Sequence, residues 1–273
     1  MTRFEDFALM ERENWTSRSL AIEYVNRFAQ AADQCIPAFV DSIGPVSGLQ
    51  AVDICCGQGS LSSALALEGA DVVGLDFSEA MLEVARRSTR GIDFCLGDAH
   101  HLPFRDDYFD VAVCGFGICH LPDQPRALSE AFRVLRSGGK FAMTVWCGPD
   151  VSPSMEILYS AIRIHGDPSV VLPAGPDFHQ FANIQTANRL LGDAGFRSIQ
   201  FRILECAWEF AEPEDLCDVF EKATARASVL LTRQPQTNLA AIRNAMANRV
   251  REEHKSSKSY KVPVPAALIF ATK

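Results

Sequence analysis

The sequence predicts an α/β domain with a mostly parallel sheet and helices on both of its faces. From residue 49 to residue 147, short runs rich in Val, Leu and Ile alternate with segments of helical spacing. The chain has 273 residues, of which 48% are hydrophobic and 22% charged, so it is long enough to bury a large core. We therefore expect one α/β domain that carries an inserted cap.

A helical segment is expected before the sheet begins. Leu20, Tyr24 and Phe28 fall on one face of a helix predicted over residues 16–40. Glycine and proline then interrupt the chain. We therefore assign residues 1–48 to an N-terminal helical segment.

The central part of the chain carries the strand–helix alternation. Ser78 is the expected N-cap of a helix, because Glu79 follows it in the first turn, where an acid suits the helix dipole. Strands are expected over 49–54, 70–75, 92–96, 109–115 and 140–146, and helices over 61–67, 78–87 and 125–135.

The rhythm changes after residue 147. Residues 148–183 contain several prolines and predict a loop-rich insertion with one short helix. Together with residues 209–258, they are expected to lie outside the sheet as a cap, so that residues 148–273 complete the sheet around it. Further strands are expected over 199–208 and 262–271, which makes seven in all, and further helices over 184–194, 212–227 and 237–253.

Charge and cysteine content exclude some classes of protein. A net charge of −8 argues against a general nucleic-acid binder, which needs a basic face. The nine cysteines are odd in number and never have C-x-x-C spacing, so we expect a reducing compartment and no metal site. The acidic N-terminus does not have the pattern of a signal peptide, and no apolar run is long enough to cross a membrane. We expect a cytoplasmic protein that binds neither nucleic acid nor membranes.

A glycine loop between the first strand and the next helix is the strongest motif. Gly57 and Gly59 let the backbone approach a ligand, and the helix that follows offers free N–H groups. Asp76 comes 19 residues after Gly57, at the tip of the next strand. A carboxylate there can accept both ribose hydroxyls of a nucleoside. The pattern therefore predicts a nucleoside site.

The motif disfavours a nicotinamide dinucleotide. The dinucleotide fingerprint has a third glycine where this chain has Ser62. Asp98, which ends the third strand, has two interpretations. It can accept a hydrogen bond from an adenine amino group, or it can cap the segment that follows it.

Three stretches of the sequence resemble the class I S-adenosylmethionine-dependent methyltransferases. They are VDICCGQGSLSSALALEGADVVGLDFSEAMLEVAR, IDFCLGDAHHLPFRDDYFDVAVCGFGICHLPD and ALSEAFRVLRSGGKFAMTVW. The subgroup that they resemble most is the ubiquinone/menaquinone-biosynthesis type, which includes many enzymes that methylate small molecules. The resemblance implies a Rossmann-like, seven-stranded sheet whose last strand is antiparallel, with S-adenosylmethionine across the strand ends.

The resemblance also implies roles for individual residues in cofactor binding. The chain departs from the family at Cys55, where a glycine is usual, and a cysteine there narrows the floor of the pocket. The implied contacts are Asp53, Gly57 and Gly59 with the methionine side, Asp76 with the ribose, Phe77 and Met81 with the adenine face, Asp98 and Ala99 with its edge, and Gly115 and Phe116 near the sulfonium.

Residues beyond these motifs are candidates for the acceptor side. His120 follows the fourth strand and is the candidate general base, although a structural histidine that bonds the turn is the alternative. Trp15 and Tyr24 are expected to shield the sulfonium by cation–π attraction, or to be buried against the sheet. Trp146 and Phe178 are expected to shape an apolar acceptor chamber.

The sequence thus predicts a methyltransferase that acts on the O, N or C atom of a small organic acceptor, a secondary metabolite or a quinone-like ring. A homodimer is the assembly that we consider. Three alternatives stay open at this point. The first is a scaffold or regulatory protein that binds S-adenosylmethionine (SAM) without transferring its methyl group. The others are an RNA or protein methyltransferase and a nicotinamide-dependent dehydrogenase.

Overall fold

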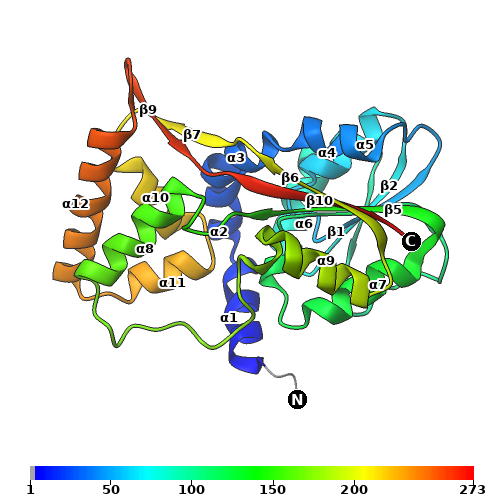
Figure 1. The fold of residues 1–273 in the computed structure, drawn as a ribbon, viewed down its shortest axis with the longest axis horizontal. Helices are drawn as coiled ribbons and strands as arrows, with labels where there is room; N and C mark the ends of the chain where they lie inside the picture. The colour runs from blue at the N-terminus through cyan, green and yellow to red at the C-terminus, as the bar shows by residue number, and fades with distance from the viewer. Residues whose placement is uncertain (1–3) are drawn as a thin grey trace.

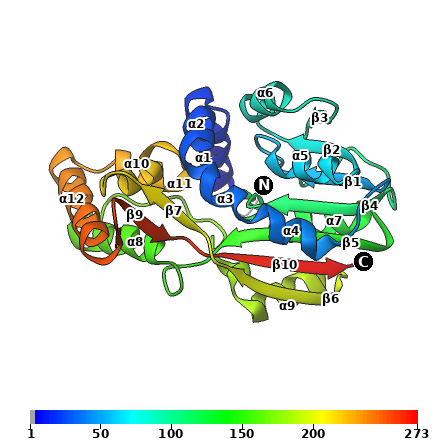
Figure 2. The same ribbon diagram turned by 90° about the horizontal axis from the view of Figure 1, so that it is seen from above.

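The computed structural model describes residues 4–273 and contains a seven-stranded sheet (Figures 1 and 2). The first five strands along the chain run parallel, and the last strand is antiparallel to both of its neighbours. This arrangement confirms the predicted Rossmann-like sheet. Across the sheet, the strands are β3 (Asp93–Leu96), β2 (Asp71–Asp76), β1 (Gln50–Ile54), β4 (Phe109–Gly115), β5 (Leu135–Trp146), β10 (Ala266–Thr272) and β6 (Arg197–Leu204).

Helices cover both faces of this sheet because its strands are apolar on both sides. Along β4, Val111 and Val113 pack into one core cluster, whereas Ala112 and Cys114 pack into the other. Successive side chains of a strand point to opposite faces, so each face needs its own layer of helices. One layer contains α4 (Ile36–Ile43), α5 (Ser60–Leu67) and α6 (Glu79–Ser88), and the other contains α7 (Gln124–Val134) and α9 (Ile184–Asp193).

A second group of elements, which we call the cap, lies beside the sheet (Figure 1). Its helices pack around a separate apolar cluster that includes Trp208, Phe220 and Met246. The cap consists of β7 (Ala207–Phe210), β9 (Ser259–Pro263), β8 (Lys255–Ser256), α8 (Pro153–His165), α10 (Asp215–Lys222), α11 (Arg226–Thr232) and α12 (Gln236–Glu253).

Two of the predicted strands are wrong in extent, because each one crosses from the sheet to the cap. The predicted strand 199–208 is divided into β6 and β7, and the predicted strand 262–271 into β9 and β10. Both strands leave the main sheet at the same place, where Val264 N donates to Cys206 O at 2.8 Å. Apolar side chains continue through this bend, so hydrophobic periodicity does not reveal it.

Several predicted helices also differ from the structure. The expected helix 212–227 breaks into α10 and α11, and the expected short helix of the insertion is the 13-residue α8. The N-terminal pattern is not one helix but α2 (Arg18–Glu23), the π-helix η1 (Tyr24–Phe28), α3 (Ala29–Asp33) and α4. Short 3-10 turns occur at η2 (Ile118–His120) and η3 (Gln180–Ala182), and a further helix, α1 (Glu5–Trp15), precedes the predicted segment.

The N-terminal helices lie between the sheet and the cap, as both views show (Figures 1 and 2). Trp15 and Leu20 pack with Met81 of α6 on one side and with Ala225 of the cap on the other. Phe28 belongs to the apolar cluster of the cap. The N-terminal segment therefore holds the two parts together. Among the described residues, no helix combines the length and apolar character needed to cross a membrane.

Candidate active site

A cavity lies where the ends of β1, β2 and β4 meet the N-terminal helices and the cap. The volume open to the centres of water molecules is about 250 Å³. Its wall is largely apolar and contains side chains from all three parts of the chain. The cavity brings together most of the predicted site residues, namely Trp15, Tyr24, Asp53, Cys55, Gly57, Asp76, Phe77, Met81, Gly115, Phe116, His120, Trp146 and Phe178.

Asp76 is held rigidly at the tip of β2. Its Oδ2 accepts the N–H of Gly57 at 2.9 Å, and its Oδ1 accepts the N–H of Ser78 at 2.8 Å. Burial raises the pKa of Asp76, and the backbone donors oppose that rise. The N–H of Phe77 is a further backbone donor to this carboxylate, which with about four lone-pair positions keeps capacity for a ligand. Asp76 is thus oriented to accept hydroxyl donors from a ligand in the cavity.

Asp53 at the end of β1 is fixed by the residue that breaks the dinucleotide fingerprint. Asp53 is only 1% exposed, and its Oδ2 accepts the hydroxyl of Ser62 at 2.6 Å. Burial raises the pKa of Asp53 to about 7, although the Ser62 hydrogen bond opposes this. A glycine in place of Ser62 would remove the hydroxyl donor to Asp53 and leave only the backbone N–H of residue 62. The chain therefore uses this position to hold an acid.

Cys55 has a backbone conformation that suits glycine. Its φ is 59°, in the left-handed region that costs a residue with a Cβ about 1–2 kcal/mol. The opposite wall makes room for its side chain, since a Cβ on Gly117 would lie 2.3 Å from the Cβ of Cys55. Cysteine at 55 and glycine at 117 therefore depend on each other.

Three predicted cofactor residues do not line the cavity. Gly59 lies beside the ring of Phe94, and Ala99 is buried in the core. Asp98 bonds its own loop, because its Oδ1 accepts the N–H of His100 at 2.9 Å and contacts His100 Nδ1 at 2.6 Å. The bond to the His100 side chain lowers the pKa of Asp98 to about 2. The position of Asp98 is compatible with both of its interpretations, loop capping and binding of the adenine edge. Its role in adenine binding therefore stays a prediction.

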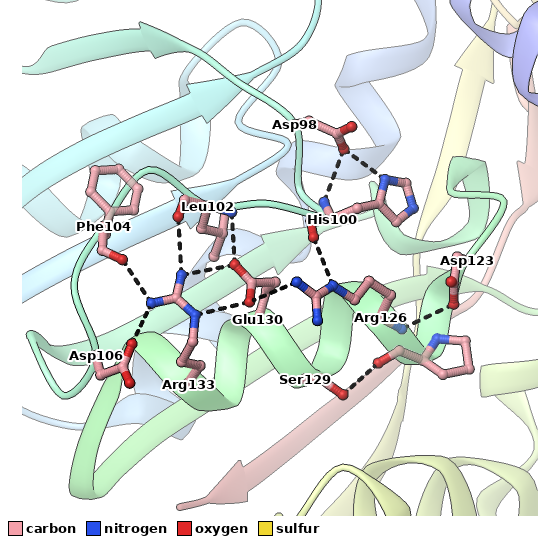
Figure 3. A network of polar contacts seen from close by, with 11 residues as sticks. Asp98, His100, Leu102, Phe104, Asp106, Asp123, Arg126, Ser129, Glu130 and Arg133 are labelled. Atoms are coloured by element: carbon pink, nitrogen blue, oxygen red, sulfur yellow. Dashed lines mark hydrogen bonds and ion pairs between the residues drawn. The ribbon is translucent and has the colours of Figure 1, made fainter. Parts of the chain in front are cut away.

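A polar network holds the loop that follows Asp98 against α7 (Figure 3). Glu130 accepts the N–H of Leu102 at 2.8 Å, and Arg133 donates to the carbonyl of Leu102 at 3.0 Å. Arg133 also pairs with Glu130 at 2.8 Å. This network fixes the shape of the loop, and with it the position of Asp98.

One face of α1 is buried beside the cavity, where Trp15 lines the wall, and the sequence prediction included Trp15 but not Phe7 or Glu11. Phe7, Glu11 and Trp15 are spaced four residues apart and are buried on the same side of the helix. The carbonyl of Trp15 accepts the hydroxyl of Ser78 at 2.6 Å, which fastens the helix to the loop after β2. The sequence does contain a signal for this face: two aromatic residues and an acid spaced four residues apart, with the acid Glu11 in the middle.

His120 forms a buried pair with the acid of that stripe. Its Nδ1 lies 2.8 Å from Glu11 Oε2, and Trp15 Nε1 donates to the same oxygen at 3.2 Å. Glu11 is only 3% exposed, and its other oxygen is buried without a partner. Burial on its own lowers the pKa of His120, whereas Cys119 and the Glu11 carboxylate raise it to about 10. The arrangement places a proton-carrying imidazole in the cavity wall.

Aromatic side chains form the rest of the chamber around His120. Trp15 and Phe178 contact its ring edge-on at centroid distances of 5.1 Å and 5.3 Å. Trp146 stacks on Phe116 at 4.0 Å. Tyr24 also lines the chamber, from the π-helix η1, a kind of element that recurs at functional sites. A flat apolar ring fits such walls.

The sheet end of the cavity fits an adenosyl group with a charged sulfur. Asp76 offers free lone pairs, Phe77 and Met81 offer apolar surface, and Thr144 Oγ1 is buried there without a hydrogen-bond partner. Gly57 has a φ of 56°, so its backbone approaches the cavity without a side chain. Within residues 4–273, no three His, Cys, Asp or Glu residues are grouped to hold a metal ion.

Comparison with known proteins identifies the family. The Methyltransferase domain family matches residues 52–143. A demethylmenaquinone methyltransferase of Renibacterium salmoninarum is 32% identical over 174 residues, which cover 60% of this chain and 73% of the relative. A second one, from Staphylococcus saprophyticus, is 46% identical over 178 residues, with 57% and 73% covered. The chain belongs to the class I S-adenosylmethionine-dependent methyltransferases.

Solved structures have the same fold as this methyltransferase. An S-adenosylmethionine-dependent methyltransferase from Mesorhizobium loti superposes with a TM-score of 0.51 at 20% identity, over 88% of this chain and 98% of the other. A Haemonchus contortus phosphoethanolamine N-methyltransferase superposes with a TM-score of 0.53 at 18% identity, over 87% and 52%. Because the chain belongs to that family, it is an enzyme whose cofactor is S-adenosylmethionine, and this excludes the dehydrogenase alternative.

Proposed function

We propose that this methyltransferase transfers the methyl group to a hydroxylated, quinone-like aromatic ring bound in the cavity. The observation that carries the proposal is the continuity of the cavity from Asp76 at the sheet end to His120 and Phe178 at the cap end. Relatives named demethylmenaquinone methyltransferases support a quinone-like acceptor. The apolar aromatic walls support a flat ring over a polar or polymeric substrate.

The sheet end is the proposed cofactor site. When bound, S-adenosylmethionine supplies a methyl group on a positively charged sulfur. Asp76 accepts the sugar hydroxyls, and Phe77 and Met81 pack beside the base. Asp53 and the glycine loop hold the methionine part. Because the cofactor is already activated, the main task of the protein is to align the acceptor and exclude water.

His120 is the proposed general base for the acceptor hydroxyl. The pKa of His120 is raised to about 10, which is close to the ordinary value of about 10 for a phenol. Proton transfer between the two is therefore nearly balanced, which favours general-base catalysis. The hydroxyl proton moves to His120, and the acceptor oxygen would bond the methyl carbon as the carbon–sulfur bond breaks, which would leave S-adenosylhomocysteine. Since His120 is protonated at neutral pH, transfer should accelerate as the pH rises toward 10.

Glu11 is the proposed positioning residue for that base. Its carboxylate engages Nδ1 of His120, so Nε2 is the nitrogen that we assign to proton transfer. Trp15 donates to the same carboxylate oxygen and fixes its direction. Carboxylates that orient a catalytic imidazole in this way also raise its basicity.

The cap is proposed to select the acceptor. Residues 148–183 contribute Tyr159, Leu172 and Phe178 to the cavity wall, and residues 209–258 contribute Phe220 and Arg226. These segments lie outside the sheet that binds the cofactor, so their side chains can vary the chamber without disturbing the cofactor end. The proposal therefore divides the chain into an N-terminal helical segment (1–48), a cofactor-binding core (49–147) and a part that completes the sheet and carries the cap (148–273).

A single-turnover assay tests the proposed function. Enzyme loaded with methyl-labelled S-adenosylmethionine is mixed with the reduced, quinol form of short-tail demethylmenaquinone and with simple naphthols and hydroquinones. We expect label on the ring acceptors, with a rate reduced at least about 100-fold in His120→Asn, as is typical when a general base is lost. Tight cofactor binding with no transfer to any hydroxylated ring would instead favour the SAM-binding scaffold.

A further inference from the structure

A cation lies at the cap end of the cavity, and no acid in the described part of the chain pairs with it. Arg226 lines the cavity at the start of α11. Its guanidinium carbon lies 5.1 Å from the ring centroid of Phe7 and 5.2 Å from that of Phe178. Within residues 4–273, Arg226 forms no ion pair, and its Nη1 is buried without a hydrogen-bond partner. The charge faces the cavity with donors to spare.

Another arginine of the cap, Arg243, has its charge paired with acids and serves as a comparison for Arg226. Both terminal nitrogens of Arg243 donate to Asp218 at 2.7 Å, and one also pairs with Glu221 at 3.0 Å. That guanidinium is neutralised by acids of the adjacent helix α10. The contrast indicates that Arg226 is left unpaired at a position where the wall is otherwise apolar.

The two phenylalanines explain how the charge is kept there. The face of an aromatic ring attracts a cation through its quadrupole and does not use the N–H donors. Phe7 and Phe178 therefore stabilise the charge of Arg226 while its hydrogen-bonding edge stays free. A buried donor without a partner is costly, and a ligand that supplies the partner removes that cost.

The polar groups beside Phe178 have hydrogen-bond partners other than Arg226. The Trp146 carbonyl can only accept, so His179 Nδ1, 3.0 Å away, carries the hydrogen, and His179 Nε2 then accepts from the Tyr159 hydroxyl at 3.3 Å. Asp177, the acid closest in sequence to Phe178, accepts the backbone N–H of His179 at 3.0 Å. None of these groups satisfies the guanidinium.

One aromatic ring separates this cation from the proposed base. Phe178 contacts Arg226 through its face and contacts the ring of His120 at a centroid distance of 5.3 Å. An acceptor ring that lies along Phe178 can therefore reach His120 with one substituent and Arg226 with another. Because the ring of Phe178 contacts both residues, a hydroxyl and an anionic group on separate rings of a bicyclic acceptor are the substituents that would reach them.

We propose that Arg226 binds a carboxylate of the acceptor, so that the substrate is an aromatic hydroxy acid. The guanidinium fork matches the two oxygens of a planar carboxylate, and a carboxylate conjugated with its ring stays flat between aromatic walls. The assignment rests on the proposed function only for the hydroxyl that meets His120. It adds a charge requirement that a purely apolar chamber would not impose.

Binding of two matched probes tests the proposal without requiring transfer. Protein saturated with S-adenosylhomocysteine is titrated by calorimetry with 6-hydroxy-2-naphthoate, whose hydroxyl and carboxylate lie on separate rings, and with 2-naphthol, which lacks the carboxylate. We expect the wild type to bind the acid at least about 10-fold more tightly than the naphthol. Arg226→Met should abolish this preference by weakening binding of the acid, and Arg226→Lys should retain part of it. The matched control Arg233→Met, which removes an exposed arginine of the cap, should keep the full preference.

Several outcomes would overturn the assignment. They are equal affinity of the wild type for both probes, a preference that survives Arg226→Met, and tighter binding of 1-naphthyl phosphate than of the acid. If Arg226→Met does not fold, the probe pair on the wild type and on Arg226→Lys still decides. An acid preference in a protein that transfers no methyl group would support this inference and contradict only the proposed function.

Discussion

The two ends of the cavity are built in different ways. At the sheet end, backbone N–H groups of Gly57 and Ser78 fix a buried carboxylate where adjacent strands stop. At the cap end, single side chains from distant parts of the chain meet, as Phe7 and Arg226 do. The first kind of site leaves a local motif in the sequence, whereas the second leaves only scattered residues. The difference explains why the cofactor is readily inferred and the acceptor is not.

The largest effect is expected from removing the anchor of the sheet end. Asp76→Ala should weaken binding of S-adenosylhomocysteine about 100-fold, because two hydrogen bonds between hydroxyls and a carboxylate are lost. Calorimetric titration measures the change. Asp71→Ala, at the exposed opposite end of β2, is the matched control and should bind normally. Unchanged affinity in Asp76→Ala would separate this end of the cavity from the cofactor.

A smaller effect tests how tightly the loop after β1 packs on the turn after β4. Gly117→Ala places a Cβ 2.3 Å from that of Cys55 and should lower the free energy of unfolding by about 1–3 kcal/mol. Denaturant melts of the variant and of Gly192→Ala, where no atom lies within 4 Å of the added Cβ, give the comparison. Cys55→Gly should rescue Gly117→Ala, and additive effects in the double variant would refute the dependence.

The next prediction concerns the acid supplied by α1. Glu11→Gln removes the carboxylate that raises the pKa of His120, so the midpoint of the pH–rate profile should move from about 10 to a lower pH. A shift of at least about one unit is expected for a charge at hydrogen-bond distance. Glu13→Gln, on the exposed side of the same helix, should leave the profile unchanged. A profile that ignores Glu11 would assign His120 to a structural role.

The smallest effect is expected from relieving backbone strain at the cofactor loop. Cys55→Gly should stabilise the protein by no more than about 1 kcal/mol, because the gain in the left-handed region is partly offset by the greater freedom of glycine in the unfolded chain. The melting temperature and the affinity for S-adenosylhomocysteine give the two readouts. A destabilised variant would show that packing of the thiol outweighs the strain.

The sequence predicts the sheet end well, because strand periodicity and turn chemistry are local. β4 has the predicted bounds, and Ser78 caps α6 by accepting the N–H of Met81 at 3.2 Å, as expected. Asp76 and Gly57 meet because both follow neighbouring parallel strands. Such patterns depend on residues that are close in the sequence, so they can be recognised without knowing the tertiary structure.

The cap end was not predictable in the same way. Nothing near Glu11 in the sequence indicates that it meets His120, which is 109 positions away. Arg226 lies at a break between two helices that periodicity joins into one. The bends that divide β6 from β7 and β9 from β10 depend on tertiary pairing between distant segments, which a single sequence does not display.

A crystal structure of the protein with S-adenosylhomocysteine and 6-hydroxy-2-naphthoate would show both ends of the cavity occupied at once. We expect the sugar hydroxyls on Asp76, the naphthoate ring along Phe178, its hydroxyl within hydrogen-bond distance of His120 and its carboxylate on Arg226. A naphthoate bound outside this cavity, or one whose hydroxyl points away from both His120 and the cofactor sulfur, would contradict this expectation.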